Sequence, residues 1–116
     1  MPDIPKGIEF IFPLSKELED RLRVTASKQR GKVIKFVVQY EAFINNDWWP
    51  IVCYDTSHGF AHKDLIHYKG RVDKQPLYFP NFSVALTFAI QDLKIGWEWY
   101  KIAFEKEMKD EESSSN

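Results

Sequence analysis

The stretch VIKFVVQYEAFINNDWWPIVCYD, residues 33–55, decides the fold. Apolar and polar residues alternate over residues 34–44, which predicts a β-strand with one buried face. Asn45-Asn46-Asp47 is typical of a turn, because Asn and Asp tolerate positive φ. Residues 48–55 then return as a second strand, so the stretch predicts a hairpin. Pro50 cannot donate to a strand ladder, and we expect it at an edge or a bulge.

The residues before this hairpin predict a short strand and a helix. Residues 8–12 alternate weakly and stop at Pro13. Over residues 15–29, Ser15 offers an N-cap, acidic residues follow in the first turn, and Gly31 offers a C-cap. Leucines recur there at helical spacing: Leu14, Leu18 and Leu22. We therefore expect an N-terminal helix over residues 15–29.

The residues after the hairpin predict one more strand and a long helix. Residues 62–68 are typical of a third strand, and residues 71–81 of a connection. From residue 82 to residue 104, apolar residues recur at steps of three and four, with Asn81 or Ser83 as the N-cap. A long C-terminal helix follows from this pattern.

Together these elements predict an α+β fold. We expect an antiparallel meander of three to four strands, with the N-terminal helix and the long C-terminal helix packed on one face. Gly96 marks a kink or a break in the second helix. Residues 1–104 should form a single domain, and residues 105–116 an acidic, frayed tail.

Composition narrows the class of protein. The chain has 116 residues, 44% of them hydrophobic, which predicts one folded domain and excludes disorder. A net charge of -1 argues against a strongly basic nucleic-acid binder. No apolar run could span a membrane, and the first residues do not resemble a signal peptide. With Cys53 as its one cysteine, the chain is expected to be cytoplasmic. Abundant aromatic residues predict a homodimer.

A polar cluster follows the hairpin and could carry chemistry. If residues 62–68 form a strand, His62 and Asp64 share one face and His67 lies on the other. Asp55 ends the neighbouring strand, and His58 lies in the loop between. We therefore expect a shared site of Asp55, His58, His62 and Asp64.

Three interpretations of this cluster remain open. In the first, His62 and His58 act as base and acid in metal-independent RNA cleavage, with Lys63 or Arg71 stabilising the phosphorane and no cofactor required. In the second, the two histidines and the two aspartates bind a divalent metal ion. In the third, the cluster is structural, and Asp55 caps the loop by accepting backbone N–H groups.

A basic segment is the second candidate site. Between residues 21 and 35 there are six basic residues and no acidic one. They could contact the phosphates of a nucleic acid, or could be the solvated end of a helix. The six residues are Arg21, Arg23, Lys28, Arg30, Lys32 and Lys35.

The segment YDTSHGFAHKD, residues 54–64, resembles the core Arg-Tyr-Asp-x-x-His-Gly-x-x-His-x-Asp of a small uncharacterised prokaryotic domain family. That family is distantly similar to the TumE-type toxins of toxin–antitoxin pairs. The likeness covers residues 37–100 and implies a compact α+β fold. Cys53 stands where the family usually has arginine.

The sequence and this resemblance favour a toxin-like or RNA-interacting protein with a His/Asp acid–base site, and RNA or an antitoxin as partner. A non-catalytic interaction module that forms a homodimer and a metal-dependent hydrolase are the alternatives.

Overall fold

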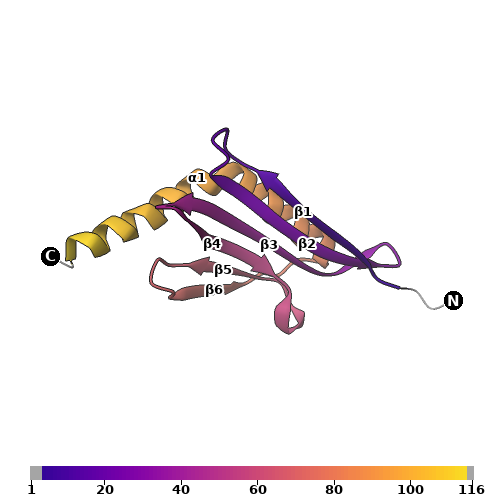
Figure 1. Ribbon diagram of the computed structural model, residues 1–116. Coiled ribbons are helices and arrows are strands. Elements are labelled where there is room, and N and C mark those ends of the chain that lie inside the picture. Colours follow the sequence, from indigo (N-terminus) through magenta and orange to yellow (C-terminus); the bar gives the residue numbers. More distant parts are fainter. Residues whose placement is uncertain (1–3, 115–116) are drawn as a thin grey trace.

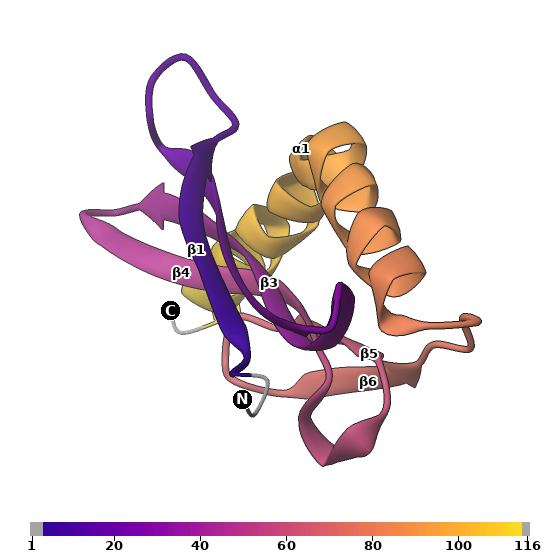
Figure 2. The ribbon, with the colours of Figure 1, turned by 90° about the vertical axis from the view of Figure 1, so that its right-hand side faces the viewer.

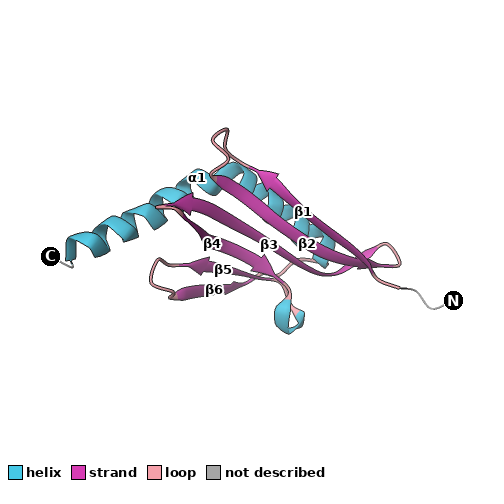
Figure 3. Cartoon of the chain, in the orientation of Figure 1, coloured by secondary structure: helices cyan, strands magenta, loops and turns pink. Residues whose placement is uncertain are grey.

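The computed structural model describes residues 4–114, in which one antiparallel sheet packs against one long helix (Figure 1). The six strands lie in the sheet in chain order, so every neighbouring pair is joined by a simple connection. The strands are β1 (Lys6–Pro13), β2 (Asp20–Gln29), β3 (Lys32–Ile44), β4 (Asp47–Asp55), β5 (His62–Ile66) and β6 (Val72–Pro76). A 3-10 turn, η1 (Ser57–Gly59), joins β4 to β5, and the helix is α1 (Phe82–Ser114) (Figure 3).

The hairpin predicted from residues 33–55 is confirmed as β3 and β4. Asn45 and Asn46 form its turn with φ values of 52° and 65°, the left-handed conformation that asparagine tolerates. The register shifts beside Pro50, since Tyr40 pairs with Val52 while the next residue of β3 pairs with Pro50. The expected bulge therefore lies where proline lacks its donor.

The predicted N-terminal helix over residues 15–29 is wrong, because most of that segment is strand β2. Leu22, Val24 and Ala26 are buried at a period of two, and β2 pairs with β1 on one side and β3 on the other. Ser15 does accept a backbone hydrogen bond, from the N–H of Glu19 to its Oγ at 3.1 Å, but the residues that it caps form a turn and not a helix. Pairing on both edges thus outweighs the helical spacing of the leucines.

The prediction of three to four strands is also wrong, because β2 and β6 add to the sheet. β6 lies within residues 71–81, which the sequence predicted to be a connection. All five of its residues are exposed, so the segment lacks the alternation of buried and exposed side chains that would have predicted a strand.

The core lies between the sheet and α1, which covers one face only (Figures 1 and 2). Ala85, Ala89 and Leu93 of the helix are fully buried. They meet the side chains that β2, β3 and β4 point toward the helix, including Tyr40 and Tyr54. Placing the helix on one face, as predicted, leaves the other face of the sheet without a helical layer.

Two polar networks attach α1 to the sheet. The hydroxyl of Tyr40 donates to Asp20 at 2.5 Å, and Lys101 of the helix lies 3.2 Å from the same carboxylate. On β4, the hydroxyl of Tyr54 donates to Asp92 of the helix at 2.6 Å. Such bonds have fixed geometry, so they set where α1 lies along the strands.

The helix begins at the predicted N-cap and continues past its predicted end. The side chain of Asn81 accepts the N–H of Val84 at 2.9 Å, which confirms it as the N-cap. The helix changes direction in its middle, the part of the segment that contains Gly96 (Figure 2). α1 continues through residues 105–114, where a frayed tail was expected, and Met108 is buried against the core. The last two residues of that tail lie outside the described part of the chain.

The outer face of α1 is apolar and exposed at Ile95, Trp99 and Ile102, with 79%, 76% and 57% of their surface accessible. The homodimer expected from the aromatic residues stays a prediction that size measurement can test.

Within residues 4–114, no helix has the length and apolar character needed to cross a bilayer.

Candidate functional site

The site lies on the face of the sheet that α1 leaves uncovered. Successive side chains of a strand alternate between faces, and Tyr54 and Lys63 point to the helix, where they contact Asp92 and Tyr100. Their neighbours on β4 and β5 therefore point to the open face. Two cross-strand rows run side by side there, one of Glu9, Thr25, Val37, Asp55, His62 and Pro76, the other of Ile11, Arg23, Gln39, Cys53, Asp64 and Lys74.

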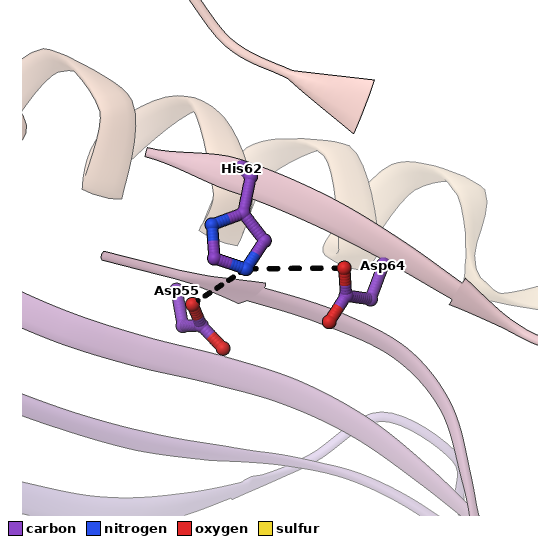
Figure 4. Close-up of side chains that lie close together, drawn as sticks. All are labelled: Asp55, His62 and Asp64. Carbon is purple, nitrogen blue, oxygen red and sulfur yellow. Dashed lines mark ion pairs between the residues drawn. The ribbon is translucent and has the colours of Figure 1, made fainter. Parts of the chain in front are cut away.

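Asp55, His62 and Asp64 form the centre of the site (Figure 4). Asp55 and His62 are direct partners across β4 and β5, and Nε2 of His62 lies 2.8 Å from Oδ1 of Asp55. The same ring nitrogen lies 3.8 Å from Oδ1 of Asp64, two residues along β5. The three side chains are 19%, 5% and 15% exposed in that order, so the carboxylates reach solvent and the imidazole is enclosed.

The carboxylate of Asp55 is held by the turn that follows it. It accepts the backbone N–H of Ser57 at 3.0 Å and the hydroxyl of Ser57 at 2.9 Å. This is the loop-capping contact that the structural interpretation expected of Asp55. The orientation of Asp55 toward His62 is therefore fixed before any ligand binds.

Cys53 lies beside the aspartates but is not reactive. Its thiol is buried and lies 3.8 Å from Oδ2 of Asp55. Burial, together with the charges of Asp55 and Asp64, raises the pKa of Cys53 to about 12. A thiol with so high a pKa remains protonated near neutral pH and is a poor nucleophile.

The imidazole of His62 has one nitrogen without a partner. Within residues 4–114, no protein atom forms a hydrogen bond with its buried Nδ1. A proton on Nδ1 would be an unpaired buried donor, which costs about 1–3 kcal/mol. Without a ligand, the arrangement therefore favours the ring with its proton on Nε2, directed at Asp55. A cation bound at Nε2 would have to displace this proton, which would leave the neutral ring protonated at Nδ1.

Lys74 belongs to the site although the sequence did not indicate it. Its ammonium lies 3.4 Å from both carboxylate oxygens of Asp64, its partner across β5 and β6. The side chain of Lys74 is 64% exposed. The sequence could have predicted this contact only if residues 72–76 had been assigned to a strand that pairs with β5.

His58 lies beside the three central residues rather than among them. Its ring centroid is 6.4 Å from that of His62, and the residue is exposed in η1 with a φ of 72°. The structure thus brings together three of the four residues predicted to share a site, with His58 adjacent.

His67 lies apart, as predicted. Its ring nitrogens contact Asp73 at 2.7 Å and Glu107 of α1 at 2.6 Å. Hydrogen bonds that the protonated ring donates to these two carboxylates raise the pKa of His67 above its ordinary value. The expected phosphate cations are also elsewhere, since Lys63 faces the helix and Arg71 lies 3.3 Å from His67.

The six basic residues predicted to bind nucleic acid fall into two groups. Arg21 and Arg23 lie on the open face and pair with Glu41 at 2.7 and 3.4 Å. Burial opposes ionisation of Glu41, but hydrogen bonds from Arg21 and Gln39 hold its pKa below the ordinary value. The remaining four lie around the turn that joins β2 to β3, at the other end of those strands: Lys28, Arg30, Lys32 and Lys35.

Comparison with known proteins identifies a family. A family model described as "Domain of unknown function (DUF7718)" matches residues 6–110. No curated protein and no solved structure matches the chain significantly. The matched residues include every strand and the central residues of the site.

Proposed function

Since this chain belongs to the DUF7718 family, whose description states no activity, we propose its function from the site itself. The protein is a metal-dependent hydrolase in which Asp55, His62 and Asp64 bind one divalent cation. A metal-dependent hydrolase was one of three functions left open by the sequence. The geometry favours it over an RNA-interacting protein with an acid–base site and over a non-catalytic interaction module.

One observation carries the proposal: Nε2 of His62 and one oxygen each of Asp55 and Asp64 lie within 4.8 Å of one another. Two atoms that bind the same ion at about 2.1 Å can be at most about 4.2 Å apart. The distances from His62 to the two carboxylates, 2.8 and 3.8 Å, meet that limit. The oxygens of Asp55 and Asp64 are no more than 4.8 Å apart, so they would have to approach by at most about 0.6 Å to bind the same ion. One imidazole and two carboxylates suit zinc, manganese or iron.

The surroundings of His62 argue against acid–base catalysis by this residue. Its Nε2 contacts Asp55, its Nδ1 is enclosed, and the side chain is only 5% exposed. A general base must reach the proton that it abstracts. A cation bound by the same three residues would leave positions for water and would lower the pKa of that water, which is the chemistry that ester hydrolysis needs.

The test is ester hydrolysis before and after metal removal. The full chain is stripped with a chelator and assayed with p-nitrophenyl phosphate, bis-p-nitrophenyl phosphate and p-nitrophenyl acetate. We expect hydrolysis of at least one ester to disappear and to return with zinc or manganese, and to be absent in Asp55→Asn. Hydrolysis that persists without metal, or no hydrolysis in the metal-loaded protein, would overturn the proposal.

Contact with RNA is a second candidate function, supported by the basic turn between β2 and β3. Lys28 and Lys32 are exposed there, and Lys6 of β1 lies directly opposite Lys28. Three cations at one end of the sheet favour phosphate contacts. RNA affinity should then fall steeply with salt and in the double variant Lys28→Glu/Lys32→Glu. Salt-independent or undetectable binding would contradict this role.

A further inference from the structure

We propose that the hollow beside Asp55 binds the phosphate group of a small phosphate ester, and that such an ester is the substrate. This inference rests on the proposed function for the reaction, but the binding of the ester is a separate property. The hollow has a volume of about 680 Å³. Sites for small ligands commonly have volumes of 300–1,000 Å³.

The hollow and the metal site share a wall. Asp55 and Ser57, which are hydrogen-bonded to each other, both line the hollow. The wall next to them is fixed, because the N–H of Phe36 donates to Oγ1 of Thr56 at 3.0 Å. A ligand in the hollow would therefore lie against the same carboxylate that we assign to the cation.

Lys35 supplies the positive charge that a phosphate needs. It lines the hollow, is exposed, and forms no ion pair within the described part of the chain. Val37, two residues along β3, is the cross-strand partner of Asp55. With strands about 4.8 Å apart and about 3.3 Å per residue, the Cα atoms of Lys35 and Asp55 are roughly 8 Å apart. A phosphate group fits between the Lys35 ammonium and a cation at Asp55.

Hydroxyl groups add donors on the same side. Ser27 is the direct partner of Lys35 across β2 and β3, and Thr25 and Ser57 also line the hollow. Glu9 is the one other acidic residue of the lining, and it lies three strands away from Asp55 in the cross-strand row. The negative end of a ligand is thus favoured near Lys35, away from Glu9.

An apolar residue of the lining indicates what the phosphate is attached to. Val37 shares the open face with Asp55 and contributes an apolar side chain to the hollow. Because this side chain cannot donate hydrogen bonds, it suits an apolar or aromatic part of the ligand. A nucleoside monophosphate has both parts and a size that suits this volume.

Gly7 provides a direct way to close the hollow. It lines the hollow, and a Cβ added at this position would meet no atom within 4 Å. Gly7→Val therefore adds bulk without a clash, and valine is favoured in strands. Lys35→Ala removes the charge instead. Lys106→Ala is the control, since Lys106 is an exposed lysine of α1 that is part of neither the hollow nor the basic turn.

Calorimetric titration of the manganese-loaded chain with adenosine monophosphate and with adenosine tests the inference. We expect the monophosphate to bind at least tenfold more tightly than adenosine, and Lys35→Ala and Gly7→Val each to lose at least tenfold while Lys106→Ala does not. Equal binding of both ligands, or unchanged binding in both hollow variants, would overturn it. So would an RNA oligonucleotide that binds when the monophosphate does not.

Failure of the proposed function has a different signature. Manganese is titrated alone into the same four proteins. Normal manganese binding with no binding of the monophosphate overturns only the assignment of the hollow. Binding of the monophosphate through Lys35 with no manganese binding overturns the metal site and leaves the hollow as a phosphate site.

Discussion

The Nε2 atom of His62 lies 2.8 Å from Oδ1 of Asp55, and the two residues are direct partners across adjacent antiparallel strands. This pairing fixes their distance through the backbone rather than through a flexible loop. Asp64 follows on the same face of β5, and so the sheet itself builds the three-residue site. The site should therefore exist in the folded chain without any ligand.

Asp64→Asn should weaken manganese binding at least about tenfold, because an amide oxygen carries no charge to stabilise the cation. Calorimetric titration measures this change. Asp73→Asn is the control, because Asp73 is also an aspartate of the β5–β6 pair but contacts His67 instead. Equal affinities of the two variants would exclude Asp64 as a ligand.

Tyr40→Phe should destabilise the protein by about 1–3 kcal/mol, because it removes a buried donor from Asp20. Asp20 is 2% exposed and would keep only the contact with Lys101 from this network. Urea unfolding measures the change in free energy. Tyr78→Phe, at a tyrosine that is 91% exposed, should change stability by less than about 0.5 kcal/mol. A similar loss in both variants would show that the hydrogen bond contributes nothing.

Leu93→Ala should cost about 2–5 kcal/mol, because Leu93 is completely buried where α1 packs on the sheet. Ile95→Ala changes a side chain of the same helix that is 79% exposed, and its effect should be small. Thermal and urea unfolding of the two variants compare them directly. A larger loss for Ile95→Ala would mean that the outer face of α1 is buried in solution, as in the predicted homodimer.

His67 should make stability depend on pH. Its carboxylate partners Asp73 and Glu107 raise its pKa above the ordinary value of 6.5, so the folded state binds its proton more tightly than the unfolded state. The stabilisation is complete below pH 6.5 and is lost as the pH rises through the raised pKa. Wild type should therefore exceed His67→Gln in stability by more at pH 5.5 than at pH 9.

Urea unfolding at both pH values tests this expectation. Lys69→Gln serves as the control, since Lys69 pairs with Glu111 of the same helix and remains charged across this range. A difference between wild type and His67→Gln that is constant, or that grows toward pH 9, would show that protonation of His67 is not linked to folding.

Several elements were predictable because local sequence and long-range pairing agree. The alternation over residues 34–44, the asparagine turn and the N-cap at Asn81 all describe structure that neighbouring residues determine. The segment over residues 15–29 misled because Ser15 does cap a turn there. Only the pairing of β2 with two neighbours, which a local pattern cannot reveal, decides that the chain continues as a strand.

The site was predictable to the extent that it follows from alternation. The placement of His62 and Asp64 on one face, with Asp55 opposite and His67 apart, follows from a period of two. Lys74 and Lys35 were not predictable as neighbours of this site. Their positions depend on the register of β6 against β5 and of β3 against β4, which is set by the whole sheet.

Titration of divalent metal ions into the chelator-treated full chain tests the central claim most directly. Calorimetry with manganese and with zinc should give one bound ion per chain in wild type, and none in the double variant Asp55→Asn/Asp64→Asn at the same concentrations. Circular dichroism establishes that the variant is folded. A folded wild-type chain that binds neither ion, or a folded double variant that binds them as well as wild type, would contradict the account.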